Sequence, residues 1–104
     1  MPQLSHAVYF TLRDRTPESA ARLVESCRKH LTGHPGAVSF SAGTLAEYDR
    51  QVNDRGFDVA LTIVFESHAA HDAYQTAPRH EEFIAENATT WAQVRVFDAD
   101  VEPA

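Results

Sequence analysis

The segment Phe57–Glu66 constrains the fold more than any other part of the chain. Apolar side chains occupy every second position in it: Phe57, Val59, Leu61, Ile63 and Phe65. A period of two predicts a β-strand with one face in a core. At the intervening positions only the outermost residues, Asp58 and Glu66, are charged. Both faces of this strand are therefore expected to be covered.

The remaining pattern predicts three further strands and three helices. Strands are expected at about 4–13, 37–46 and 92–99, and helices at about 17–32, between Ser67 and Pro78, and at about 79–90. Thr16 is a suitable N-cap for the first helix, and Gly33 is a suitable C-cap. The second strand is expected to place Val38, Phe40 and Ala42 on one face.

This order of elements is the βαββαβ pattern of α+β, ferredoxin-like domains. Its four antiparallel strands would carry helices on one face only. The opposite face would hold Tyr9, Ala60, Thr62, Val64 and Phe97. That set is too apolar to face water in a small domain, so the sequence predicts a homodimer that pairs through the open face.

Composition limits the kinds of partner. The 104 residues suit one domain, with a core over about 4–99 and a loose tail at 100–104. The formal net charge of −6 argues against nucleic acid and against a membrane surface, because both reward clustered Lys and Arg. The N-terminus shows no signal-peptide pattern, so a cytoplasmic location is expected. The single cysteine, Cys27, falls on an apolar helix stripe and is expected to be a small buried hydrophobe.

The segment Tyr74–His80 is the best candidate for chemistry. A phenol and an imidazole flank Pro78, which is expected to end one helix and begin another. Burial would keep His80 neutral and able to accept a proton, while Tyr74 would donate a hydrogen bond to a developing oxyanion. Two alternatives remain at this level: ligand contact without chemistry, and a structural role in tying the helix start to the sheet.

The other histidines give weaker signals. His6 alternates with Val8 and Phe10, so it is expected to point toward the helices and could reach the same cavity. His68 and His71 stand three apart on a helix, but two ligands do not make a metal site. Both are therefore expected on a solvated helix face, and no metal is expected.

In the order in which they occur, several short motifs resemble the stress-responsive A/B barrel (Dabb) family. The resemblance covers about 4–99 and is carried by His6–Phe10, Pro35–Val38, Gly56–Leu61, Phe65–Ser67, Tyr74, Pro78–His80, Phe83 and Val96–Asp98. It implies a ferredoxin-like protomer that forms a dimeric α/β barrel. It also implies a pocket between helices and sheet whose walls would be Val8, Phe10, Phe83, Trp91, Val94 and Val96.

The family includes plant stress proteins without an established reaction and a plant polyketide cyclase that needs no metal or organic cofactor. The resemblance to that cyclase implies that Tyr74 and His80 act together in an aldol-type ring closure, while a further pocket histidine of the cyclase falls on Val59. The implied function is cofactor-free acid/base work on a small carbonyl or aromatic compound. The alternatives are a non-catalytic stress or structural dimer, and a cofactor-free monooxygenase that would use Asn87 and Trp91.

Overall fold

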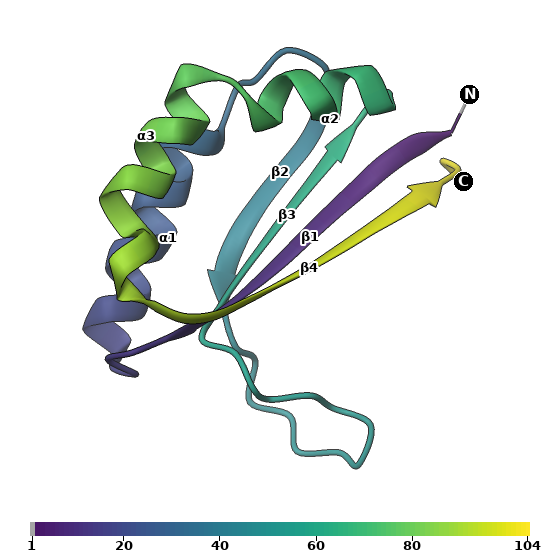
Figure 1. Cartoon of the computed structure of the whole chain (residues 1–104). Coiled ribbons are helices and arrows are strands. Elements are labelled where there is room, and N and C mark those ends of the chain that lie inside the picture. The colour runs from purple at the N-terminus through teal and green to yellow at the C-terminus, as the bar shows by residue number, and fades with distance from the viewer. Residues whose placement is uncertain (1) are drawn as a thin grey trace.

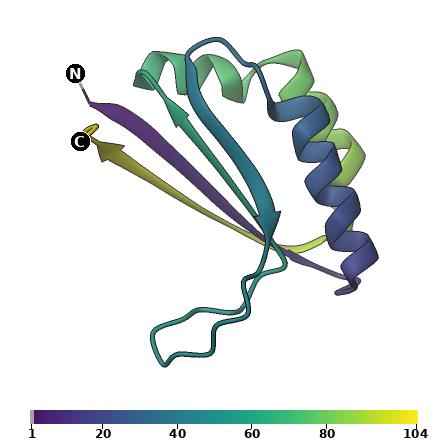
Figure 2. The same cartoon turned by 180° about the vertical axis from the view of Figure 1, so that it is seen from behind.

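Four antiparallel strands form one sheet in the order β2–β3–β1–β4, and all the helices lie on one side of it (Figures 1 and 2). This computed structural model describes residues 2–104. The elements are β1 (Gln3–Leu12), α1 (Pro17–Leu31), β2 (Ala37–Thr44), β3 (Val59–Phe65), α2 (His68–Gln75), α3 (Pro78–Asn87), the 3₁₀ turn η1 (Ala88–Thr90) and β4 (Trp91–Val101). The predicted α+β, ferredoxin-like βαββαβ fold is confirmed.

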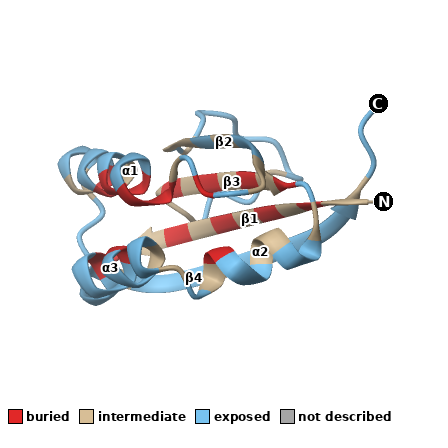
Figure 3. Ribbon diagram, turned by 90° about the horizontal axis from the view of Figure 1, so that it is seen from above, coloured by how far each residue is buried: buried red, intermediate tan, exposed pale blue. Residues whose placement is uncertain are grey.

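The core lies between the sheet and the helices. Every second residue of β1 and β3 is buried, which gives the red bands on these strands in Figure 3. The largest fully buried side chains are Phe65, Leu31, Ile63, Val59 and Cys27. Edge strand β4 is mostly exposed, because α2 and α3, which lie above it in Figure 3, do not pack closely against it. This uneven cover decides where a cavity can form.

Local sequence signals set the helix boundaries. The Thr16 hydroxyl accepts a hydrogen bond from the backbone N–H of Ser19, and Gly33 follows α1 with φ +72°. Ser67 caps α2 in the same way as Thr16 caps α1, and Pro78 is the first residue of α3. The last helix was expected to reach residue 90. It ends at Asn87, and η1 leads into β4.

The turn between α1 and β2 contains a glycine, Gly36, at which any side chain would clash with a neighbouring helix. Gly36 has φ +81°, and a Cβ there would overlap the Cβ of Ala70 in α2. Gly33 also has a positive φ, but nothing lies within 4 Å of its missing Cβ. We expect Gly33→Ala to lower the free energy of unfolding by about 1 kcal/mol, the penalty for a left-handed backbone alone. Gly36→Ala should lower it by about 2–4 kcal/mol, because overpacking is added.

Urea denaturation of the two variants at equal protein concentration measures this difference. If Gly36→Ala and Gly33→Ala lower the free energy of unfolding equally, the packing of α2 against Gly36 does not exclude a methyl group at that position.

The face of the sheet away from the helices holds the predicted apolar residues. Ala60, Thr62 and Val64 are half-buried, and Phe97 is 55% exposed. The Tyr9 ring lies between Phe57 and Phe97, with ring centroids 5.0 and 5.8 Å away. We refer to Tyr9, Phe57, Ala60, Thr62, Val64 and Phe97 as the open face.

Two expectations about strand faces are wrong. Phe57 was expected on the core face of the third strand, but β3 begins at Val59 and the Phe57 ring packs on Tyr9 of the open face. Val38 was expected beside Phe40 and Ala42, but the pairing of β2 with β3 shifts between Ala37 and Ser39. This bulge leaves Val38 outside the core and 56% exposed.

The expected loose tail is also shorter than predicted. Asp100 and Val101 belong to β4, where they pair with Leu4 and Gln3 of β1. The two chain ends therefore lie side by side (Figure 1). None of the helices formed by residues 2–104 is long and apolar enough to cross a membrane.

Candidate functional site

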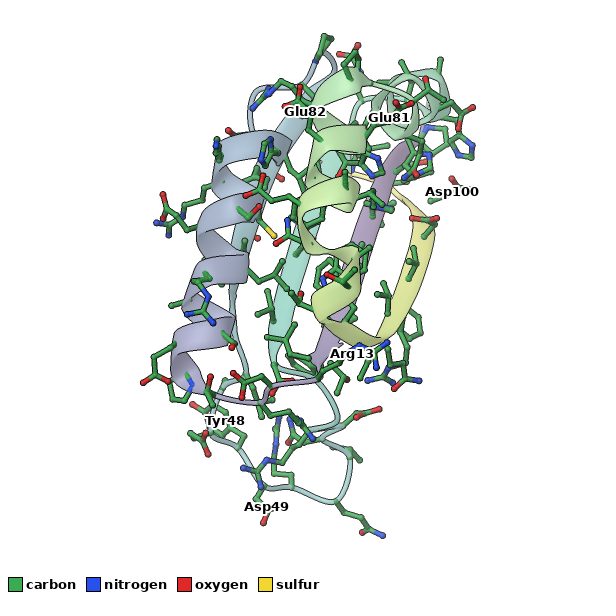
Figure 4. The ribbon with its side chains drawn as sticks, turned by 60° about the vertical axis from the view of Figure 1, so that its left-hand side comes forward. Arg13, Tyr48, Asp49, Glu81, Glu82 and Asp100 are labelled. Atoms are coloured by element: carbon green, nitrogen blue, oxygen red, sulfur yellow. The ribbon has the colours of Figure 1, made fainter. Side chains whose placement is uncertain are left out.

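A cavity of about 420 Å³ lies between the sheet and helices α2 and α3. The nine site residues proposed from the sequence all line it: His6, Val8, Phe10, Tyr74, His80, Phe83, Trp91, Val94 and Val96. The lining is completed by Leu31, Leu61, His71, Gln75, Ile84 and Asp98. The ionisable groups gather at one end. Figure 4 marks this end by Glu81, next to His80, and by Asp100, whereas Arg13 lies at the opposite end of the sheet.

The cavity exists because β4 is an edge strand without a helix packed closely on it. Val94 and Val96 of β4 face the helix side, opposite Phe10 and Val8 of β1. They are nevertheless 39% and 50% exposed. Apolar side chains that are left accessible in a concave wall are typical of small-molecule sites.

Tyr74 lies in the last turn of α2 and is only 2% exposed. Its ring packs against Phe65, His34 and His80, with centroids 5.0, 4.9 and 4.7 Å away. The Tyr74 side chain lines the cavity. Burial raises the pKa of this phenol well above its usual value, so Tyr74 stays protonated and can donate a hydrogen bond.

His80 lies in the first turn of α3, which Pro78 begins. Its ring meets the Tyr74 ring edge-to-face, at an interplanar angle of 72°. The half-buried ring lines the cavity. Burial lowers the pKa of His80, and nearby His6, His34 and His71 lower it further, while Glu81 opposes the shift. His80 is therefore held as a neutral base.

His6 is 4% exposed and directly opposite Asp98 in the β1–β4 pairing. Its Nδ1 lies 2.6 Å from Asp98 Oδ1. Burial lowers the pKa of His6, and the bond to Asp98 opposes this effect. A neutral His6 donates from Nδ1 to the carboxylate, which leaves the Nε2 lone pair free.

Trp91 closes the apolar end of the cavity. Its ring packs against Phe10 and Phe83, with centroids 5.0 and 5.8 Å away. Among the residues from 2 to 104, its Nε1 is the one buried side-chain nitrogen or oxygen without a hydrogen-bond partner. A buried donor without a partner is costly, so Trp91 offers an N–H to an acceptor that the chain itself does not supply.

The model of the stress-responsive A/B barrel domain family matches residues 4–101. The chain belongs to this family. The sequence resemblance is thus confirmed over nearly the whole chain. No curated protein is detectably similar in sequence.

Solved structures agree with the family fold. A dimeric ferredoxin-like protein of unknown function from Thermobifida fusca is 19% identical, covers 96% of this chain and 92% of its own, and has a TM-score of 0.78. A hydroxynitrile lyase from Passiflora edulis is 18% identical and has a TM-score of 0.77; the match covers 99% of this chain and 96% of the lyase. A putative antibiotic biosynthesis monooxygenase from Chloroflexus aurantiacus is 14% identical and also has a TM-score of 0.77; the match covers 98% of this chain and 95% of that protein. At these identities the likeness establishes the fold.

Two ionisable residues of this A/B barrel domain's cavity were missed in the sequence. His71 was expected on a solvated helix face, yet its ring packs against His6 and Phe65, with centroids 4.9 and 5.6 Å away. Asp98 had no visible role, because its position opposite His6 depends on strand register. The expectation holds for His68, which is exposed and paired with Asp100.

Three other candidates take structural positions. Val59 is fully buried and is not among the cavity residues. Asn87 donates from Nδ2 to Ser26 Oγ and to the Phe83 carbonyl, so it joins α3 to α1. Cys27 is fully buried as expected, and burial raises the pKa of its thiol to about 12. A thiol with that pKa is a poor nucleophile at neutral pH.

Proposed function

We propose that this A/B barrel domain is a homodimer in which each cavity binds a small carbonyl or aromatic compound, and that Tyr74 and His80 carry out acid/base chemistry on it without a cofactor. One observation carries the proposal. A protonated phenol and a neutral imidazole lie side by side at the wall of an apolar cavity, with their ring centroids 4.7 Å apart. A hydrogen-bond donor beside a base in a concave, mostly apolar wall is the arrangement that acid/base work on a small ligand needs.

The proposed chemistry begins with removal of a proton from a carbon next to a carbonyl. The His80 lone pair takes the proton, and the C–H electron pair forms the enolate. The Tyr74 hydroxyl donates a hydrogen bond to the carbonyl oxygen, on which negative charge develops. In an aldol step, the enolate carbon attacks a second carbonyl carbon, and the new alkoxide takes the proton back from His80. No external oxidant or reductant is needed.

The walls favour a ligand with a polar end and an apolar end. His80 and Tyr74 define the polar end, while Phe83, Val94 and Val96 supply apolar contacts. The unpartnered Trp91 Nε1 suits a second acceptor on the ligand or an aromatic hydroxyl. A ring compound that carries a carbonyl and a hydroxyl group would meet all of these groups.

The homodimer would form through the open face. Its side chains are half-buried or exposed in one protomer, and a symmetric partner is the commonest cover for such a patch. The Thermobifida fusca protein with the same fold is described as dimeric. The cavity lies on the other side of the sheet, so dimerisation would leave it accessible.

A lyase reaction, as the name of the Passiflora edulis protein indicates for that enzyme, fits the site better than the monooxygenase alternative. Cleavage of a hydroxynitrile also needs a base for a hydroxyl proton and no redox cofactor, and His80 could serve in this role. The monooxygenase hypothesis relied on Asn87, which is already bonded to Ser26 and Phe83. A purely structural dimer is disfavoured by a cavity whose walls carry a phenol, three imidazoles and the unpartnered Trp91 Nε1.

The test is proton exchange at the methyl group of acetophenone in D₂O, followed by NMR. The protein should accelerate this exchange, and His80→Ala should reduce the acceleration by about 100-fold or more, because general-base catalysis typically contributes that much. Tyr74→Phe should reduce it by about tenfold or more, since one hydrogen bond to a buried developing charge is lost. His68→Ala, which removes an exposed imidazole outside the cavity, is the matched control.

The pH dependence gives a second readout of the same variants. Exchange should be fastest when His80 is neutral and should fall as the pH drops through its pKa, which its surroundings hold below 6.5. His6, His34, His71 and Glu81 are the ionisable groups that influence this pKa. If His80→Ala and Tyr74→Phe leave both acetophenone affinity and exchange unchanged, the proposed site is wrong.

A further inference from the structure

We propose that His6, His71 and Asp98 form a binding site for a divalent first-row transition-metal ion, such as Zn²⁺ or Co²⁺, at the polar end of the cavity. One ligand atom from each of the three residues lies within 4.8 Å of the other two. Two imidazoles with one carboxylate suit such ions and leave coordination positions open for water or a ligand. The family resemblance implied no metal, so this inference rests on the geometry of His6, His71 and Asp98.

Three separate elements bring the ligands together. His6 on β1 and Asp98 on β4 are direct cross-strand partners and point to the helix side of the sheet. His71 comes from α2, whose packing places its ring 4.9 Å from the His6 ring. Asp98 and His71, which follow His6 by 92 and 65 positions in the sequence, thus lie beside it in the fold.

An ion at this site would replace hydrogen bonds that the ligand atoms now make. His6 Nδ1 lies 2.6 Å from Asp98 Oδ1, so these two atoms become ligands when the ion displaces the proton on Nδ1. The side-chain amide nitrogen of Gln75 lies 3.2 Å from His71 Nε2 and donates to it, so Gln75 must turn away when His71 Nε2 binds the ion. His71 Nδ1 lies 3.2 Å from Asp72 Oδ1, and a carboxylate that orients the non-ligating nitrogen is the usual partner of a metal-binding histidine.

Binding requires only a small rearrangement of the site, in which His6 Nδ1 and Asp98 Oδ1 move slightly apart and His71 moves closer to them. Bonds of about 2.0–2.2 Å place ligand atoms about 3.0–3.5 Å apart around a tetrahedral or octahedral ion. His6 is fixed by its burial against Phe65 and Tyr74. Asp98 is free to turn, because its side chain is 41% exposed, and that exposure also gives an ion a path from solvent.

The chain contains a natural comparison for this site. His68 and Asp100 also form a His–Asp pair, on the same two elements that supply His71 and Asp98. Both of their side chains are 60% exposed, and neither belongs to the group of three ligands within residues 2–104. An ion held by any exposed His–Asp pair would use His68, whereas the proposed site requires His71.

The test is titration of the tag-free, full-length protein with Co²⁺, followed by its visible absorption bands and by calorimetry. We expect one ion per chain and ligand-field bands of a site with nitrogen and oxygen donors. His71→Ala and Asp98→Asn should each weaken binding by about 100-fold or more, because losing a ligand costs more than losing an outer-shell partner. His68→Ala should bind as the wild type does.

Weak binding that is equal in the wild type and in both His71→Ala and Asp98→Asn would overturn the proposal, as would binding that depends on His68. Asp98→Asn keeps the shape of the side chain, and circular dichroism checks that both variants fold. Acetophenone exchange measured in excess EDTA separates this inference from the proposed function. If exchange is lost in His80→Ala but is unchanged in EDTA, the acid/base proposal stands whether or not the protein binds Co²⁺.

Discussion

Val64→Glu is expected to convert the proposed dimer into a monomer of 11.6 kDa. Val64 lies on β3, one of the two central strands, opposite Ser5 of β1 on the open face. In a dimer that pairs through this face, the new carboxylate would be buried without a cation to pair with it. An unpaired buried charge costs several kcal/mol, and each 1.4 kcal/mol weakens association tenfold. The dissociation constant should therefore rise by about 100-fold or more.

Light scattering after size exclusion, over a range of protein concentrations, measures this change. Val52→Glu is the matched control, since it introduces the same charge at a side chain that is 86% exposed in the β2–β3 connection. Retained helicity in Val64→Glu shows that the protomer still folds. A wild-type monomer, or a Val64→Glu dimer of unchanged affinity, would rule out the open face as the interface.

Phe65→Ala is expected to lower the free energy of unfolding by about 3–5 kcal/mol. Phe65 is fully buried, with an exposed fraction of 0%. Its ring packs against three rings of the candidate site. The ring centroids of Tyr74, His71 and His6 lie 5.0, 5.6 and 6.4 Å from that of Phe65. The truncation would leave a void that the sheet cannot close, and the three site rings would lose their common support.

Urea denaturation at a fixed protein concentration measures the stability, because a dimer's stability depends on concentration. Phe65→Leu is the control that keeps most of the volume, and it should cost less than about 1.5 kcal/mol. Under conditions where Phe65→Ala remains folded, its Co²⁺ affinity and its acetophenone exchange should both fall. A loss of less than about 1.5 kcal/mol for Phe65→Ala would show that the core relaxes around the missing ring.

The sequence predicted the fold well where periodicity and capping agree. The alternation in β1 and β3, the Thr16 and Ser67 caps and the Pro78 break each act over a few residues, so they can be recognised without tertiary structure. Predictions failed where one residue changes the register. The bulge after Ala37 moves Val38 out of the core, and the late start of β3 places Phe57 on the opposite face.

The candidate site divides in the same way. Residues on one periodic face, such as Val8, Phe10 and Phe83, could be assigned to the cavity from their spacing and from the family resemblance. His71 and Asp98 could not, because their role depends on how far α2 leans over β1 and on the pairing of β1 with β4. No local pattern in the sequence records either distance.

The sequence by itself determined the order of elements, the family and the pair Tyr74 and His80, because short-range spacing and local chemistry are enough for these. Only the tertiary structure decided that β4 lies at the sheet edge with its valines uncovered, and that a cavity remains there. It also decided that His6, His71 and Asp98 meet. Such contacts depend on strand register and helix packing, which arise from the sum of many long-range interactions.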